Sequence, residues 1–295
     1  SSLPILIESC IHLGLKMLDE KYIEKLNSFL KDDFEKDLFF AARKNLDAEY
    51  HSLTFNNFAY AMRELIRHLL HRSAPDEEIV QCSWYKYDST SRSGITRRQR
   101  LQYMIHGGLG VYLLKKLDLV QVINDACDNL LSQQKRLDSF THIGPNTFGI
   151  SLVDSEKLAE ECIEAVIEII SIIDQIKQAV FEKIEDTLDS HLLESTIFES
   201  CEEIEILANR ASIEELYAEG FDDIKILSNK VIFIVNGTAN CHFEYGSRKE
   251  WNEGDGTVLK PSFPFQAEVS VIIQQPFGEE IIVHRVGINT DSWYE

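Results

Sequence analysis

The sequence of 295 residues lacks the features of several specialised protein classes. No run approaches the roughly 18 consecutive apolar residues of a membrane-spanning helix, and the first residues carry no basic segment that would indicate a signal peptide. The six cysteines lie far apart without a CxxC pair, which argues against zinc ribbons and a disulfide scaffold. We therefore predict reduced thiols and a cytoplasmic location.

Motifs of common enzyme classes are also missing. The sequence contains no P-loop, no GxGxxG fingerprint, no HExxH zinc motif and no GxSxG nucleophile elbow. The glycine-rich run at residues 106–110 does not follow a predicted strand, so we do not expect it to bind phosphate. The chemistry must therefore be sought in residue patterns other than these motifs.

Charge is distributed unevenly along the chain. The net charge is −20, which on average disfavours binding to nucleic acid. Residues 61–116, however, contain 10 basic and 5 acidic residues, net +5, whereas residues 151–230 contain 6 basic and 21 acidic residues, net −15. A polyanion would therefore bind within residues 61–116, although a chance excess of surface charge is the alternative.

The pattern is helical as far as about residue 225. Apolar residues at three- and four-residue spacing predict helices over residues 3–18 and 22–40, and a continuous apolar stripe predicts another over residues 55–72. A further helix is expected to begin near Thr96. We predict that residues 1–225 form an all-α domain.

Two later helices complete this predicted domain. A long acidic amphipathic helix is expected over about residues 155–190. Ser212 and Glu215 form a capping-box pattern, and Gly220 could end the short helix that this pattern predicts.

The periodicity then changes to that of strands. β-branched and aromatic runs separated by Gly, Pro and Asn cover residues 230–235, 240–245, 267–274 and 280–286. Asn236-Gly237 would form a turn or a bulge between the first two. We predict an antiparallel β module over residues 226–295, and hence an α+β protein.

The helix over residues 55–72 carries a polar face with catalytic potential. Arg63, Arg67 and His71 are four residues apart and share one face, as do Glu64, His68 and His71. Guanidinium groups beside imidazoles suit phosphodiester cleavage without a metal, because Arg binds the phosphate and His moves a proton near neutral pH. A solvated helix face is the alternative.

Metal chemistry is a competing interpretation of the same face. Glu64, His68 and His71 could supply a first shell for Zn, Mn or Fe. This interpretation predicts a metal-dependent nuclease, with DNA as a conceivable substrate.

A second group combines basic and aromatic residues. Arg97, Arg98 and Arg100 follow Trp84 and Lys86 closely in the sequence. Cations that meet phosphates and rings that stack on bases suit single-stranded nucleic acid, so we expect these residues to bind the strand. A positively charged loop that pairs with acidic helices is the alternative.

Several motifs together resemble the predicted nucleases associated with prokaryotic Piwi-like proteins. The resemblance covers about residues 55–295 and rests on the segments 61–78, 84–85, 96–103, 107–109, 139–143, 147–148, 235–238, 245–246 and 262–265. It implies a nuclease of bacterial conflict systems, including antiviral defence against phage. The polar positions that coincide with the family pattern are Arg63, Arg67, His68, His71, Arg97, Arg98, Arg100 and His142.

The helical content and three Arg–His pairs also resemble HEPN ribonucleases. The pairs are Arg63–His68, Arg100–His106 and Arg136–His142. The sequence departs from that pattern because Glu64 or Leu137, rather than a small polar residue, follows the Arg of two pairs. The resemblance implies a HEPN-like helical domain and a homodimer.

The function that we predict from the sequence is metal-independent cleavage of RNA without a cofactor. His142 would act as general base or acid, Arg63 and Arg67 would hold the scissile phosphate, and His68 or His71 would be the second proton carrier. Besides the metal-dependent nuclease, a non-catalytic regulatory or sensor subunit that binds another protein of a defence complex is the alternative.

Overall fold

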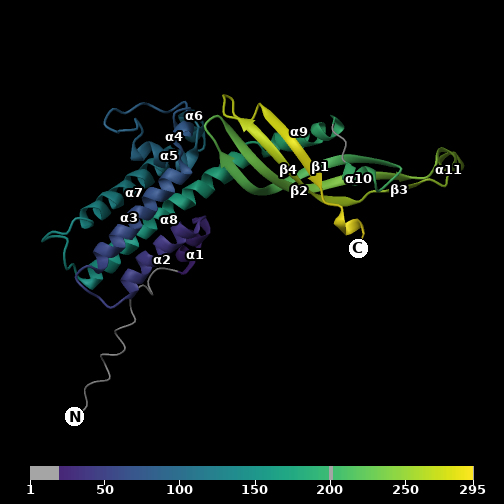
Figure 1. Ribbon diagram of the computed structural model, residues 1–295. Helices are drawn as coiled ribbons and strands as arrows, with labels where there is room; N and C mark the ends of the chain where they lie inside the picture. Colours follow the sequence, from purple (N-terminus) through teal and green to yellow (C-terminus); the bar gives the residue numbers. More distant parts are fainter. Residues whose placement is uncertain (1–19, 199–201, 295) are drawn as a thin grey trace, which may run out of the picture. The chain divides into compact units, whose positions relative to one another are not determined.

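The computed structural model describes residues 20–198 and 202–294. The chain divides into two compact units (Figure 1). The helical unit contains the described residues up to Val80, Tyr85–His106 and Leu114–Ile176, and the sheet unit contains Gln81–Trp84, Gly107–Leu113 and the described residues from Lys177 onward. This architecture confirms the α+β class, with a helical region followed by an antiparallel sheet.

The helices have the following bounds: α1 Glu20–Phe29, α2 Asp33–Asp47, α3 Thr54–Ser73, α4 Asp76–Ile79, α5 Arg97–His106, α6 Val111–Lys116, α7 Val120–Phe140, α8 Leu152–Glu182, α9 Glu185–Phe198, α10 Glu202–Glu205 and α11 Arg248–Glu253. A 3₁₀ turn follows at Asp291–Trp293. None of the helices in the described part combines the length and hydropathy needed to cross a membrane.

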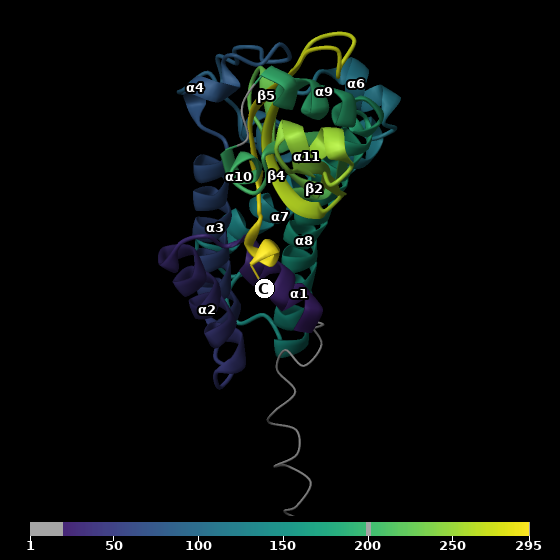
Figure 2. The same ribbon diagram turned by 90° about the vertical axis from the view of Figure 1, so that its right-hand side faces the viewer.

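Helix α3 is the centre of the helical unit. Its predicted apolar stripe is confirmed, because every member is buried: Phe55, Phe58, Ala59, Met62, Leu65, Ile66, Leu69 and Leu70. The helix packs against α2, α5 and α7, and Figure 2 shows α2 and α3 as neighbours. Burial of this stripe leaves the opposite, polar face of α3 available for other roles.

Local capping decides where several helices begin and end. The helix predicted over residues 22–40 is two helices, because the side chain of Asp32 accepts a hydrogen bond from the backbone of Glu35 and starts α2 anew. Thr96 and Gln99 make the reciprocal bonds that start α5. The long acidic helix is confirmed as α8 but ends at Glu182. The helix predicted over residues 3–18 lies outside the described residues.

The sheet is antiparallel throughout. Its strands are β1 Arg210–Ile226, β2 Lys230–Tyr245, β3 Thr257–Leu259, β4 Ser262–Ile272 and β5 Ile281–Ile288, in the order β1-β2-β4-β5, with β3 paired to β2. Alternate residues of β2 and β4 are buried. Helix α9 contacts β1 and β5, and Phe181 at the end of α8 packs on Phe221 and Phe233. One face of the sheet therefore forms the core of this unit.

Strand β1 contradicts the short helix predicted around Ser212, Glu215 and Gly220. These residues pair with β2 along its length, with register shifts at Ile213/Glu215 and Ala218/Gly220. The irregularities break the alternation of polar and apolar residues by which a strand is recognised in a sequence. Pairing with β2 thus outweighs the local capping pattern.

Glycines allow close backbone contacts within the sheet unit. Strand β2 continues through Asn236-Gly237, so the two strands predicted on either side of this pair are one strand. A Cβ at Gly237 would lie 1.9 Å from the carbonyl oxygen of Tyr217. Gly108 donates its N–H to Leu227 at 2.9 Å, and a Cβ there would lie 1.9 Å from the carbonyl oxygen of Ser228. Gly108 therefore serves packing against the β1–β2 turn.

Candidate functional site

The polar face of α3 borders a pocket of about 690 Å³ in the helical unit. The other walls come from α5, from α7 and from the segment that precedes α5. The residues that line it are Arg63, Glu64, Arg67, Leu70, His71, Thr90, Ser91, Ser93, Ile95, Thr96, Arg97, Arg100, Gln134 and Asp138. Residues at four-residue spacing on α3 thus reach one cavity, as the helical period requires.

Two arginines of α3 are held by one carboxylate. Glu64 Oε1 accepts hydrogen bonds from Nη2 and Nε of Arg63 at 2.7 and 3.2 Å, and Glu64 Oε2 accepts from Nε of Arg67 at 2.9 Å. The hydrogen bond from Arg63 lowers the pKa of Glu64, and Arg67 adds to this effect, so the carboxylate is ionised at neutral pH. Arg63 also donates to the Thr141 hydroxyl at 3.1 Å.

The arginines of α5 differ in their exposure. Arg97 contacts Asp138 at 2.9 Å and keeps 62% of its side chain exposed. Arg100 keeps only 8% exposed, donates to the carbonyl oxygen of Ala74 at 3.0 Å and pairs with Asp76. Arg97 is therefore accessible to a ligand, whereas Arg100 mainly holds the end of α3 and adds positive potential.

His71 is the imidazole in the pocket. Desolvation lowers its pKa from the ordinary value of 6.5, and the positive charges of Arg100 and Arg67 lower it further, while Asp76 partly opposes them. His71 is therefore neutral at pH 7, which is the form that can accept a proton. Four guanidinium groups face two carboxylates in the lining, so the pocket is positively charged in an otherwise acidic chain.

The segment before α5 supplies hydroxyl groups and a fixed backbone. Thr90, Ser91 and Ser93 line the pocket, and the carboxylate of Asp88 accepts hydrogen bonds from the N–H of Thr90 at 2.8 Å and from its hydroxyl. Gly94 has φ +74°, and a Cβ there would lie 2.4 Å from the ring of Tyr87. The loop depends on this glycine for its path beside the pocket.

Two family models, both described as predicted pPIWI-associating nuclease, match residues 27–166 and 173–294. The chain belongs to this family of predicted nucleases. Searches among curated proteins and among solved structures give no match. The whole lining of the pocket lies within the first matched segment.

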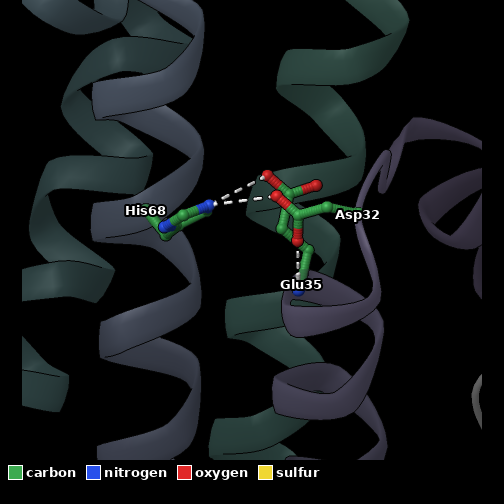
Figure 3. A group of neighbouring side chains, drawn as sticks. All are labelled: Asp32, Glu35 and His68. Atoms are coloured by element: carbon green, nitrogen blue, oxygen red, sulfur yellow. Dashed lines mark hydrogen bonds and ion pairs between the residues drawn. The ribbon is translucent and has the colours of Figure 1, made fainter.

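His68 of this predicted pPIWI-associating nuclease does not enter the pocket. It points from α3 toward the start of α2, where its Nε2 lies 3.3 Å from Oδ2 of Asp32 and 3.7 Å from Oε1 of Glu35 (Figure 3). Within residues 20–198 and 202–294, these three residues form a group whose ligand atoms lie within 4.8 Å of one another, close enough for a metal ion. Glu64 and His71 are not part of it.

The carboxylate oxygens of this group already have hydrogen-bond or ion-pair partners within the protein. Oε2 of Glu35 accepts the backbone N–H of Lys31 at 2.8 Å, and Oε1 pairs with the guanidinium of Arg72. Oδ1 of Asp32 caps α2. A metal would have to compete with Arg72 for Glu35 and would require His68 to be deprotonated, so the contacts also suit a network that joins α2 to α3.

Three of the residues predicted to bind the strand lie outside the pocket lining. Arg98 pairs with Asp128 and donates to the side-chain oxygen of Asn124 at 3.2 Å. Trp84 belongs to the sheet unit, where its indole N–H donates to the carbonyl oxygen of Gly107 at 2.9 Å. Lys86 is exposed and does not border the cavity. The contacts of Arg98 and Trp84 serve packing within their units.

His142 is exposed and does not line the pocket. It follows Thr141, the residue whose hydroxyl contacts Arg63. Its carbonyl oxygen accepts a hydrogen bond from the hydroxyl of Thr147 at 2.9 Å, which orders the turn after α7. The chain therefore brings His142 to the end of α7 that borders Arg63.

None of the three HEPN-like Arg–His pairs places both members in the pocket. Arg63 and Arg100 line it, but His68 and His106 do not, and Arg136 pairs with Glu161 of α8. The pocket instead joins Arg63, Arg67 and His71 through the helical period. Asp138 and the hydroxyl-bearing loop were not among the predicted site residues. The turn-forming residues Asp88, Ser89 and Thr90 and the glycine at position 94 are the sequence signal that could have pointed to an ordered loop here.

Proposed function

We propose that this chain is a metal-independent endoribonuclease whose active site is the pocket along α3. The observation that carries this proposal is the convergence of Arg63, Arg67, His71 and Arg97 on one cavity. Arginine and neutral histidine are the groups that phosphodiester cleavage without a metal requires. The family description supports nuclease activity and association with pPIWI proteins, and we propose that the chain acts with such a partner in antiphage defence.

In the proposed reaction Arg63 and Arg67 bind the non-bridging oxygens of the scissile phosphate. Neutral His71 takes the proton of the ribose 2′-hydroxyl, whose oxygen attacks the phosphorus, and the bond to the 5′-oxygen breaks. The products are a 2′,3′-cyclic phosphate and a 5′-hydroxyl, which receives a proton from a general acid. We assign that role to His142, which does not line the pocket but follows Thr141, the residue that contacts Arg63, so it would reach the 5′-oxygen from outside the lining.

Glu64 and Arg97 would support this step without touching the reacting atoms. Glu64 fixes the direction of both phosphate-binding guanidiniums. Arg97, largely exposed at the rim, would bind a neighbouring phosphate of the strand. DNA lacks the 2′-hydroxyl that serves as the nucleophile, so it should not be cleaved.

A second candidate is a metal-dependent nuclease that uses Asp32, Glu35 and His68. The observation that favours it is the short distance between their ligand atoms. It differs from the first candidate in requiring a divalent ion and in losing activity when His68, rather than His71, is replaced.

The experiment compares cleavage of labelled single-stranded RNA and matched DNA by the purified chain, with and without EDTA. The variants are His71→Gln, His68→Gln and His142→Ala, with His191→Gln on α9 as a matched histidine control. We expect RNA cleavage that resists EDTA, falls at least 100-fold in His71→Gln and persists in His191→Gln. Cleavage that is lost with EDTA and in His68→Gln would establish the metal-dependent candidate instead.

The role of the pPIWI partner is tested by a separate measurement. If the isolated chain cleaves no probe, the same assay is repeated with the pPIWI partner added. Absence of cleavage in that mixture as well would contradict the nuclease assignment and would favour a regulatory role.

A further inference from the structure

The sheet unit contains a second polar pocket, of about 270 Å³. Its lining residues come from the end of β2, from α11 and from the start of β1. Figure 1 shows where β2 leads into α11. The walls of the pocket include Asn209, Arg210, Glu244, Arg248, Trp251 and Asn252. Two arginines, two side-chain amides and an indole thus meet in one cavity of a unit that is otherwise acidic.

Local structure fixes the walls of this pocket. Ser247 and Glu250 form a complete capping box at the start of α11, and Gly254 ends the helix with φ +85°. The N–H of Gly246, a residue with φ +114°, donates to Oδ1 of Asn209 at 3.3 Å, which ties the end of β2 to the segment before β1. Arg248 and Trp251 are therefore carried by a short helix with defined ends.

Trp251 lies flat on backbone and yet remains accessible. A Cβ at Gly256 would lie 2.4 Å from its ring, so a glycine is required where the indole rests. The residue nevertheless keeps 39% of its surface exposed. An indole that is ordered but exposed in a concave site is typical of a stacking surface, because the exposed part of the ring becomes buried only when a ligand covers it.

The cations of the pocket are available to an anion. Arg248 has no ion-pair partner among the described residues, whereas its neighbour Lys249, outside the pocket, pairs with Glu253 at 3.8 Å. Arg210 contacts Glu244 at 3.3 Å but keeps 80% of its side chain exposed. Guanidinium groups bind phosphate oxygens in two-pronged geometry, and the amides of Asn209 and Asn252 can hydrogen-bond a base edge.

We propose that this pocket binds a nucleobase with its phosphate, as one unit of a single-stranded nucleic acid, at a site separate from the cleavage pocket. The base stacks on Trp251, and the phosphate is held by Arg248 and Arg210. A base that stacks on an aromatic ring beside a guanidinium is the arrangement by which proteins hold unpaired strands. The sheet unit thereby acts as a substrate-binding module.

The test measures intrinsic tryptophan emission of the full chain during titration with AMP and with a short oligo(dA). Both probes lack the 2′-hydroxyl next to a scissile phosphodiester, so binding is measured whether or not the chain cleaves RNA. The variants are Trp251→Phe and Arg248→Gln, with Lys249→Gln as the matched cation control. Thermal unfolding of each variant checks that the fold is retained.

We expect quenching that disappears in Trp251→Phe, where the reporting indole is absent. In the same variant the affinity measured by dialysis should fall less than about threefold, because phenylalanine can still stack. We expect Arg248→Gln to weaken binding at least about tenfold and Lys249→Gln to leave it unchanged.

Quenching by oligo(dA) but not by AMP supports the proposal and shows that neighbouring nucleotides contribute. Quenching by AMP alone would overturn the strand assignment. The proposal also fails if neither probe produces quenching that depends on Trp251, or if Arg248→Gln binds as tightly as the native chain. His71→Gln should cleave no RNA and still show the quenching, so failure of one site is distinguishable from failure of the other.

Discussion

Glu64 is an acidic residue in a pocket that we assign to a polyanion. On charge alone it would weaken phosphate binding. Its two oxygens, however, bind Arg63 and Arg67 separately, so the carboxylate holds two long side chains in one orientation. Fixing these side chains before the ligand arrives reduces the entropy lost on binding, and this gain acts against the repulsion that the carboxylate adds.

The protonation of His71 leads to a prediction about pH. Because its pKa lies below 6.5, the imidazole stays neutral through pH 7 and becomes charged only as the pH falls further. RNA cleavage should therefore decline on the acid side of the profile, below about pH 6.5. The unfolded chain binds this proton more readily, so the related contribution to stability is also present above pH 6.5 and is lost as the pH falls.

The charge of Arg67 is one cause of this shift, which a titration can test. Arg67→Gln removes a nearby positive charge and should raise the pKa of His71 toward 6.5, measured by NMR of its ring protons. Arg98→Gln is the control, because Arg98 pairs with Asp128 outside the pocket. An unchanged pKa in Arg67→Gln would contradict the electrostatic explanation.

At the residue scale the sequence grouped Arg63, Arg67 and His71 on one face of α3, as the pocket lining has them, but it also grouped His68 with Glu64 and His71, whereas His68 lies beside Asp32 and Glu35. The period of 3.6 residues places Arg63, Arg67 and His71 together whatever the tertiary structure does. His68 could not be assigned, because its orientation depends on Asp32 and Glu35, which the start of α2 brings near from a distant part of the chain. Only the packing of α2 on α3 reveals that network.

At the level of elements, a single buried amide joins α3 to α7. The side-chain nitrogen of Asn56 donates to the carbonyl oxygen of Phe140 at 2.7 Å, and both groups are buried. The contact fixes the end of α7 that also presents Thr141 to Arg63. It therefore connects the stability of the helical unit with the geometry of the pocket.

We predict that Asn56→Ala lowers the free energy of unfolding by about 1–3 kcal/mol, because it leaves the Phe140 carbonyl buried without a partner. Chemical denaturation measures the loss. Asn45→Ala is the control: Asn45 is partly exposed on α2, and its side-chain nitrogen donates to the carbonyl oxygen of Ala41 within the same helix, so the better helix propensity of Ala should leave stability equal or slightly higher. Equal effects in the two variants would show that the α3–α7 contact contributes nothing.

Strands were predicted well where apolar and polar residues alternate along the sequence, and poorly where this alternation is broken. Strands β2, β4 and β5 follow the expected β-branched runs, because alternate residues of β2 and β4 enter the core. Strand β1 carries bulges and many carboxylates, including Glu214, Glu215 and Glu219, and its identity comes from hydrogen bonds to β2. Such non-local pairing leaves little trace in a local pattern.

For the whole molecule, the net charge of −20 predicts that nucleic acid is repelled, whereas the basic pocket predicts that it is bound. An anion experiences mainly the charges within a Debye length, about 8 Å at physiological salt, so the local arginines decide whether a strand binds. Acidic surfaces outside this pocket and outside the pocket at Arg248 and Trp251 repel strands. The chain should therefore bind nucleic acid through few phosphates, unlike a protein with a broad basic surface.

The small number of phosphate contacts sets the salt dependence that we expect for binding of single-stranded RNA to the His71→Gln variant, which does not cleave its ligand. Arg63 and Arg67 would neutralise the scissile phosphate, Arg97 a neighbouring phosphate, and Arg248 with Arg210 a third. The logarithm of the binding constant should then fall with the logarithm of the salt concentration with a slope near −2, because each contact contributes about −0.7. Adding Arg97→Gln should reduce the slope by about 0.7, whereas Lys135→Gln, an exposed cation of α7 outside the pocket, should not change it. A slope steeper than about −5 would mean that a wide surface binds the strand, and a slope of zero would mean that these arginines do not contact phosphate at all.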